Sequence, residues 1–212
     1  MSWRGPATLS ATIDGNPYNW ALNNTFDVGT TVIIWKATDG CGHFTTAAQN
    51  VVIVDGQYPT IDCGDNQFVN ADAGVCTATL VPTAPSFSDN CPGPVLTATI
   101  NGDPYTPGTS HAFPRGLTEV HWRVTDAHGN ATTCIHNVTV SDTQIPIFDT
   151  CPGPISENAD AGGCTYTFSP VHPTFHDNCD ANALITLTAT LDGSPYDYVS
   201  FPSLTLDRKS VV

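Results

Sequence analysis

The chain has 212 residues, and its six Lys and Arg against twenty Asp and Glu give a formal net charge of −14 at pH 7. Such a charge repels nucleic acid and anionic membrane surfaces, so neither is expected as a partner. No stretch approaches the roughly 20 apolar residues of a membrane helix, so membrane insertion is not expected. Thr, Asn, Ser, Gly and Pro are abundant, which favours strands and turns over helices.

Eight cysteines indicate the compartment in which the chain works. A cytosolic protein of this size keeps its thiols reduced and rarely carries so many. Their spacing recurs along the chain, which favours a disulfide framework over scattered thiols. We therefore expect an extracellular or cell-surface protein.

An internal repeat with a period of about 88 residues organises the chain. Residues 11–18 return as residues 98–105 and again as residues 189–196, at offsets of 87 (98 − 11) and 91 (189 − 98). We name three segments from this period: repeat 1 (1–57), repeat 2 (58–144) and repeat 3 (145–212). Repeat 2 is expected to be complete, repeat 1 to be the C-terminal part of a module and repeat 3 the N-terminal part of another.

Within repeat 2 the pattern predicts short strands at residues 67–70, 76–81, 95–100, 111–113, 117–125 and 132–140. The clearest is 117–125, in which Val120, Trp122 and Val124 alternate with polar residues. Many short strands with turns between them and no helical period are typical of an immunoglobulin-like β-sandwich. Trp122 is predicted to fill the core, with Trp35 in the same role in repeat 1. His136 is predicted to lie on the surface.

Four motifs recur in these strands and turns: Ala71-Asp72-Ala73-Gly74-x-Cys76, Asp89-Asn90-Cys91, Trp122-x-x-Thr125-Asp126-x-x-Gly129-Asn130 and Val138-Thr139-Val140-x-Asp142. Together they resemble the HYR (hyalin repeat) domain over nearly the whole chain. The likeness is closest to the form found in tandem in large surface proteins of gliding and marine bacteria. It implies an immunoglobulin-like fold, a role in extracellular adhesion or architecture, and no catalysis.

Six cysteines are expected to form three bonds within the chain. If successive strands alternate in direction, the loop at Cys91 and the start of the last strand share one end of the sandwich. The expected pairs are Cys91–Cys134, Cys63–Cys76 and Cys151–Cys164. A rival to the second and third is Cys76–Cys151, because Cys76 begins a strand beside the following repeat.

Cys41 and Cys179 are left over by this scheme. One explanation is truncation of the chain, which leaves both thiols unpaired. The other is a bond between chains, in which the back half of one subunit completes the front half of the next. Strand donation of this kind, repeated head to tail, builds a fibre.

Oxygen ligands are expected to converge where one repeat meets the next. Asp89, Asn90, Asp126 and Asn130 share one end of repeat 2, and Asp55 enters the same region from repeat 1. Ca²⁺ takes six to eight oxygen ligands, so a calcium site is one hypothesis. The next joint would use Asp142, Asp177 and Asn178. The other hypothesis is ordinary turn chemistry, since turns favour Asp and Asn.

The sequence carries no Gly-x-Ser-x-Gly, phosphate loop or dinucleotide fingerprint, so neither an enzyme nor an organic cofactor is expected. The function expected is a structural or adhesive repeat, with a second copy or neighbouring modules as partners. The alternative is an accessory glycan-binding domain of a secreted carbohydrate-active enzyme. In that case Tyr18, Tyr105 and Tyr196 would stack on surface glycans rather than cover the edge of the sandwich.

Overall fold

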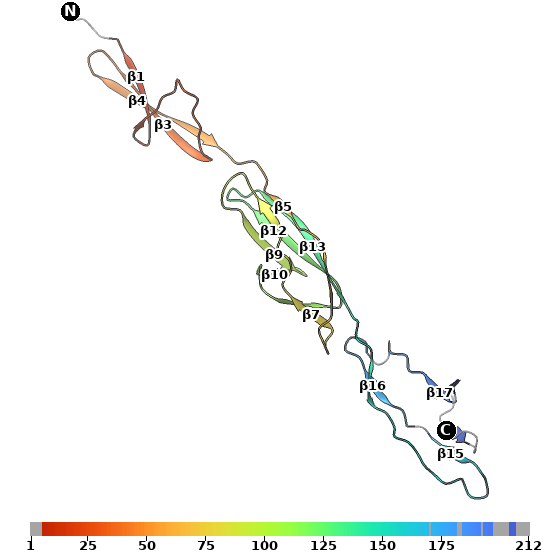
Figure 1. Cartoon of the computed structure of the whole chain (residues 1–212). Coiled ribbons are helices and arrows are strands. Elements are labelled where there is room, and N and C mark those ends of the chain that lie inside the picture. The colour runs from red at the N-terminus through yellow and green to blue at the C-terminus, as the bar shows by residue number, and fades with distance from the viewer. Residues whose placement is uncertain (1–5, 170, 182–183, 192, 197–203, 207–212) are drawn as a thin grey trace, which may run out of the picture. The chain divides into compact units, whose positions relative to one another are not determined.

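The computed structural model describes residues 6–169, 171–181, 184–191, 193–196 and 204–206 (Figure 1). The described residues contain many short strands and no α-helix, which confirms the all-β prediction. No described helix has the length and apolar character that a membrane span requires. Two compact units divide the chain. Unit 1 holds residues 1–63, 85–98 and 121–134, and unit 2 holds residues 64–84, 99–120 and 135–212.

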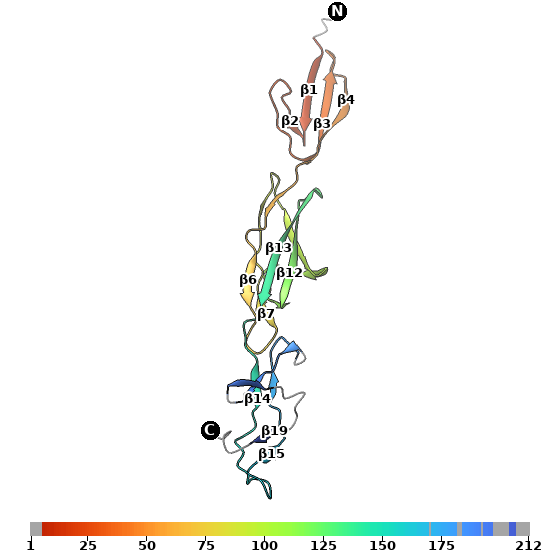
Figure 2. The same ribbon diagram turned by 90° about the vertical axis from the view of Figure 1, so that its right-hand side faces the viewer.

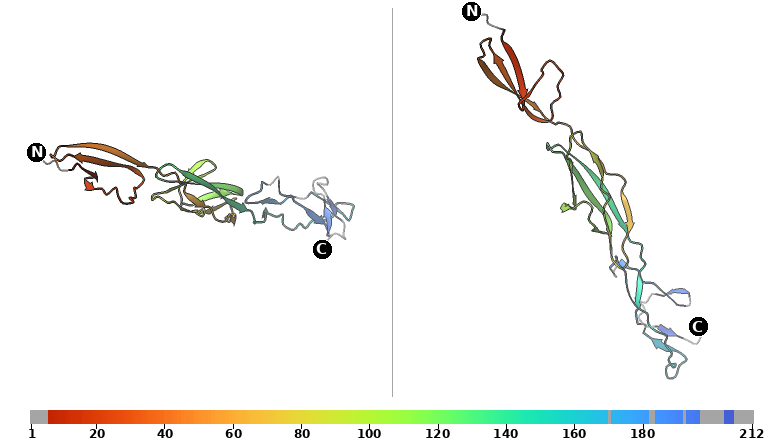
Figure 3. Two further views of the ribbon diagram at one scale, coloured as in Figure 1. Left: turned by 90° about the horizontal axis from the view of Figure 1, so that it is seen from above. Right: turned by 60° about the vertical axis from the view of Figure 1, so that its left-hand side comes forward.

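Repeat 1, red to orange in Figure 3, forms one antiparallel sheet in the order β2-β1-β3-β4. Its strands are β1 (Thr8–Ile13), β2 (Asn16–Pro17), β3 (Gly29–Thr38) and β4 (Phe44–Ile53). Asp14 and Gly15 join β1 to β2 with φ angles of 51° and 78°, the left-handed pair that a tight two-residue hairpin requires. Trp35 is only half-buried, and its Nε1–H donates to Gln49 Oε1 at 2.8 Å. The expectation that Trp35 fills a core is therefore wrong, because the described strands of repeat 1 form a single layer.

Repeat 2 contains a five-stranded sheet in the order β10-β9-β12-β13-β6, part of which is seen face on in Figure 2. Two shorter sheets pair β5 with β8 and β7 with β11. The strands are β5 (Thr60–Asp62), β6 (Gln67–Asn70), β7 (Thr77–Leu80), β8 (Ser86–Ser88), β9 (Val95–Ile100), β10 (Asp103–Tyr105), β11 (His111–Pro114), β12 (Gly116–Thr125) and β13 (Ala131–Ser141). All six predicted strands are present. The three that were not predicted are three residues long, too short to show a period of two.

The core of repeat 2 follows the alternation of its strands. Val120, Trp122 and Val124 of β12 are all fully buried, while the residues between them are exposed. Phe113 of β11, in one of the shorter sheets, is also fully buried. Apolar faces buried on both layers define a β-sandwich, as predicted. His136 is fully buried, so its surface prediction is wrong: it has the same parity on β13 as Val138 and Val140.

Strand β6, near the start of repeat 2, pairs in parallel with β13, the last strand of the repeat. Val138 lies opposite Gln67 and Val140 opposite Val69. The buried His136 explains part of this pairing, since its Nε2 lies 2.9 Å from Gln67 Oε1. The assumption that all strands alternate in direction therefore fails at this edge of the sheet.

Repeat 3 forms three described strand pairs, and each reproduces a pair of repeat 2. They are β14 (Ile147–Thr150) with β16 (Thr174–His176), β15 (Tyr166–Phe168) with β19 (Leu204–Leu206), and β17 (Ala189–Leu191) with β18 (Ser194–Tyr196). Their counterparts by the sequence period are β5 with β8, β7 with β11, and β9 with β10. Repeat 1 likewise reproduces the order β10-β9-β12-β13 in its own four strands. The same local sequences therefore form the same pairs in each repeat.

Candidate functional site

The first disulfide bond joins Cys63 to Cys134, with their Cα atoms 6.0 Å apart. The expected pair Cys91–Cys134 is wrong. The reason lies in the register of β6 and β13, in which Gln67 pairs with Val138. Cys63 lies four residues before Gln67, and Cys134 lies four residues before Val138. Two parallel neighbouring strands thus deliver both cysteines to the same end of the sheet.

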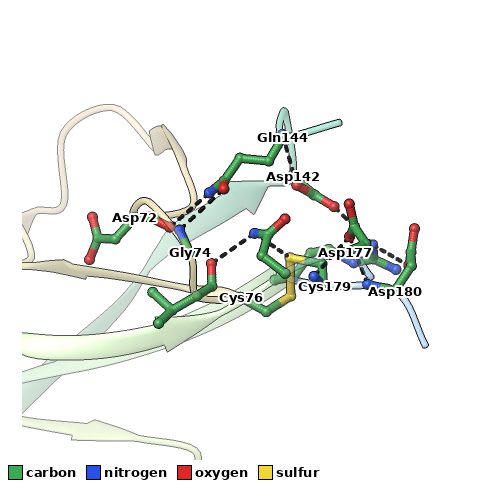
Figure 4. The surroundings of a disulfide bond; sticks show 11 residues. Asp72, Gly74, Cys76, Asp142, Gln144, Asp177, Cys179 and Asp180 are labelled. Carbon is green, nitrogen blue, oxygen red and sulfur yellow. Dashed lines mark hydrogen bonds and ion pairs between the residues drawn. A yellow bond between two sulfur atoms is a disulfide. The ribbon is translucent and has the colours of Figure 1, made fainter. Parts of the chain in front are cut away.

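The second disulfide bond joins Cys76 of repeat 2 to Cys179 of repeat 3, with their Cα atoms 4.7 Å apart (Figure 4). Cys76 directly precedes β7, and Cys179 lies in the loop after β16. Asp177 Oδ1 shapes that loop by accepting the backbone N–H groups of Cys179 and Asp180, both at 2.9 Å. The rival prediction placed Cys76 correctly beside the next repeat, but its partner Cys151 is wrong. The bond also occupies Cys179, so the predicted Cys41–Cys179 bond between chains is wrong.

The expected local pairs fail because a strand separates their cysteines. Cys63 precedes β6 and Cys76 follows it, and four residues of strand span about 13 Å. Disulfide bonds require Cα atoms within about 7 Å of one another. Cys151 and Cys164 are the counterparts of Cys63 and Cys76, and both are exposed free thiols, so that predicted pair is not formed either. Cys41 and Cys91 are also free.

Gln144 ties the chain that leaves repeat 2 to the turn that follows β6 (Figure 4). Its Nε2 donates to the carbonyl of Asp72 at 3.0 Å, and its Oε1 accepts the N–H of Gly74 at 3.1 Å. Its own N–H donates to Asp142 Oδ1 at 3.1 Å. Sequence reasoning missed Gln144, although the same Asp-x-Gln spacing occurs at Asp55 and Gln57, where the N–H of Gln57 donates to Asp55 Oδ1 at 3.0 Å.

Three carboxylates meet where repeat 1 enters repeat 2, and we call Asp55, Asp89 and Asp126 acidic cluster 1. One oxygen from each lies within 4.8 Å of the others. The Asp55 side chain is 1% exposed and Asp126 is 6% exposed. Asn130 joins them, since its Nδ2 donates to Asp126 Oδ2 at 2.7 Å and to the carbonyl of Asp55 at 3.2 Å. Asn90 is exposed, and its amide donates to Cys91 Sγ at 3.4 Å.

Hydrogen bonds keep the carboxylates of Asp55 and Asp126 charged. Burial acts to raise the pKa of Asp126, but donors from Asn130 and from the backbone of His128 outweigh it and hold the pKa below its usual range. The backbone N–H of Gln57 is the main cause that lowers the pKa of Asp55. Beside them, the Asp55 carboxylate and burial raise the pKa of the Cys91 thiol. The joint therefore carries negative charge at neutral pH.

A second group of carboxylates lies where repeat 2 enters repeat 3, and we call Asp142, Asp177 and Asp180 acidic cluster 2. The guanidinium of Arg115 lies against it, with Nη1 2.8 Å from Asp180 Oδ1 and 3.6 Å from Asp142 Oδ2. Asn178, which was predicted as a ligand, donates from Nδ2 to the carbonyl of Val75 at 2.9 Å, and its Oδ1 is buried without a hydrogen-bond partner.

Sequence reasoning missed both Asp180 and Arg115. The only available signal was a lone arginine at the start of the clearest predicted strand, immediately before Gly116.

Two of the three recurring tyrosines have described side chains, and both pack within the protein. Tyr105 is only 9% exposed, and its hydroxyl donates to the carbonyl of Thr109. Tyr18 packs against the rings of Phe26 and Trp35. The side chain of Tyr196 lies outside the described residues. Tyr105 thus covers the edge of the sandwich, the second of the two predicted roles.

Comparison with known proteins matches part of the chain to a family. Residues 54–140 match the HYR domain family, which confirms the predicted HYR domain for a segment that closely follows repeat 2. Hyalin of Strongylocentrotus purpuratus is 31% identical over 172 residues, covering 78% of this chain, but the chain spans only 14% of Hyalin. The human desmocollin-1 ectodomain is 14% identical, with 86% of this chain and 42% of that one covered at a TM-score of 0.29, which is too low to carry an argument. The bacterial form of the domain and the tandem array stay predictions.

The disulfide connectivity can be read directly by mass spectrometry of a digest prepared without reductant. We expect cross-linked peptides that contain Cys63 with Cys134 and Cys76 with Cys179, because the strand register and the loop after β16 bring these pairs together. Alkylation before digestion should label Cys41, Cys91, Cys151 and Cys164. Recovery of a Cys63–Cys76 peptide would show that the β6–β13 register is wrong.

Proposed function

We propose that the chain is a non-catalytic, extracellular adhesive repeat protein whose repeats carry mechanical load. The match to the HYR domain and the similarity to Hyalin support an adhesive role. Two disulfide bonds support an oxidising compartment outside the cytosol. The observation that carries the proposal is the Cys76–Cys179 bond, which joins repeat 2 to repeat 3.

The Cys76–Cys179 bond shortens the path that a pulling force must follow. A force transmitted along the backbone reaches Cys63, continues for 13 residues to Cys76, and crosses to Cys179 through the second bond. Residues 77–178, which include β9, β12 and β13, lie outside this path. Even a fully unfolded repeat 2 would therefore lengthen little under tension, which suits a protein that holds two surfaces together.

The difference in length is large. Without either bond, 116 residues separate Cys63 from Cys179, and a fully extended chain of that length spans about 420 Å. With both bonds the 13-residue path spans at most about 47 Å. With the Cys63–Cys134 bond alone the path runs through the 45 residues from Cys134 to Cys179, or about 160 Å.

Single-molecule force spectroscopy of the intact chain, held at its two ends, tests the load-bearing role. We expect the extensible length between Cys63 and Cys179 to be about 47 Å in the oxidised protein and about 420 Å after reduction. The variant Cys76→Ser should give about 160 Å. The matched control Cys63→Ser should behave like the oxidised wild type, because the path through Cys76 and Cys179 survives. Equal lengths before and after reduction would contradict the proposal.

We also propose a second copy of the chain as a partner, which would extend the array head to tail. The sheet of repeat 1 has the strand order of four strands of the five-stranded sheet in repeat 2, but its inner face is only partly covered among the described residues, where Ala11 and Ile33 are buried and Trp35 is half-buried. Ile53 is 37% exposed, whereas its counterpart Val140 is 2% exposed. Repeat 3 carries the strand pairs β14–β16 and β15–β19, whose counterparts form the shorter sheets of repeat 2.

Sedimentation velocity over a range of concentrations tests this partner. We expect the chain to self-associate, and Ile53→Asp to abolish the association because it places a charge on the open face. Val52→Asp is the matched control, since Val52 is 61% exposed on the opposite face of the same strand. A wild-type chain that stays monomeric at every concentration would contradict the second copy and leave a neighbouring repeat as the cover of this face.

A further inference from the structure

The two acidic clusters differ in the cation that faces them. In acidic cluster 2 the guanidinium of Arg115 contacts Asp142 and Asp180. Residue Val28 occupies the position of Arg115 in repeat 1, 87 residues earlier and again directly before the glycine that opens the long strand. Among the described residues, no Lys or Arg forms an ion pair with acidic cluster 1, where His128 Nδ1 stands 3.5 Å from Asp55 Oδ2.

Two carboxylate oxygens of acidic cluster 1 have no hydrogen-bond partner. They are Asp55 Oδ2 and Asp89 Oδ1, and both are fully buried. The Asp55 side chain that holds the first is 99% buried, since its exposed fraction is 1%. A buried carboxylate oxygen without a partner is costly, so such groups are normally paired or bound to a metal.

Backbone N–H groups hold one oxygen of each carboxylate in place. Asp126 Oδ1 accepts the N–H groups of His128 and Asn130 at 2.8 and 2.9 Å, and Asp89 Oδ2 accepts the N–H of Cys91 at 3.0 Å. Asp55 Oδ1 accepts the N–H of Gln57 at 3.0 Å. Asp55 and Asp89 are thus each fixed by one oxygen, whereas Asp126 is fixed by both, because its Oδ2 also accepts Asn130 Nδ2–H. The second oxygen of Asp89 and that of Asp55, which has His128 Nδ1 at 3.5 Å, accept no hydrogen bond and can serve a ligand.

We propose that acidic cluster 1 binds one Ca²⁺ ion, held by the carboxylates of Asp55, Asp89 and Asp126. Both unpartnered atoms are carboxylate oxygens, the hard donors that Ca²⁺ uses, and water would complete its six to eight ligands. Cys91 and His128 also reach Asp55 within 4.8 Å, a donor set that would suit Zn²⁺ instead. The ion links the segment leaving β4 to two loops of repeat 2, as Arg115 links repeat 2 to the loop at Asp180.

Calorimetric titration of the intact chain with CaCl₂ tests the site. We expect one ion per chain with a Kd of about 10⁻⁴ to 10⁻³ M, the range of extracellular calcium modules, and a rise in Tm on binding. Asp55→Asn should weaken binding at least about tenfold because it removes one charge from the ligand set. This variant keeps an oxygen to accept the N–H of Gln57, and far-UV circular dichroism checks that it folds. Asp142→Asn is the matched control and should leave the affinity unchanged.

Exchanging the residues at the two equivalent positions, Val28 and Arg115, makes the test specific. Val28→Arg should supply an internal cation to acidic cluster 1 and abolish calcium binding. Arg115→Val should remove the cation from acidic cluster 2 and raise the stoichiometry to two ions per chain. No heat of binding and no change in Tm with CaCl₂ in the wild type would overturn the proposal. Binding of ZnCl₂ that is lost in Cys91→Ser, with no response to CaCl₂, would also overturn it and assign the donors to zinc.

Discussion

The parallel pairing of β6 with β13 is the constraint on which the rest of repeat 2 depends. It places β6, near the start of the repeat, beside β13, its last strand, and the two strands run in the same direction. Where both strands begin, Cys63 bonds to Cys134 and the Thr132 hydroxyl donates to the carbonyl of Pro59 at 2.6 Å. Where both end, the N–H of Ala71 donates to the carbonyl of Ser141 at 2.9 Å. This edge of the five-stranded sheet therefore holds together the segment that enters repeat 2 before β6 and the start of β13. It also holds the turn after β6 against the end of β13.

The two joints between repeats are stabilised by different chemistry. At the second joint a disulfide bond contributes about 2–4 kcal/mol and Arg115 neutralises the carboxylates. At the first joint Cys91 takes the place of Cys179 as a free thiol, and three carboxylates face one another without an arginine. The same backbone design thus carries a disulfide bond and an arginine at one joint, and carboxylates with a free thiol at the other.

The strands could be predicted from the sequence because burial on one face imposes an alternation that Val120, Trp122 and Val124 display plainly. The convergence of Asp55, Asp89 and Asp126 could also be predicted, since turn residues at one end of a sandwich must meet. The disulfide pairs could not be predicted by the same means. They depend on the direction of β6, and no local pattern in four residues reports whether a strand pairs in parallel. Arg115 was missed because its partners lie in the following repeat, far away in the sequence.

The parallel pairing itself is open to direct measurement by NMR spectroscopy of the intact chain. The account predicts cross-strand nuclear Overhauser effects between Hα and amide protons of Phe68 and its neighbours and those around Thr139, the pattern of parallel strands in this register. Strong Hα–Hα effects between the two strands would show antiparallel pairing. Either that result or the absence of any contact between them would contradict the account, because the disulfide bond at Cys63 depends on this edge.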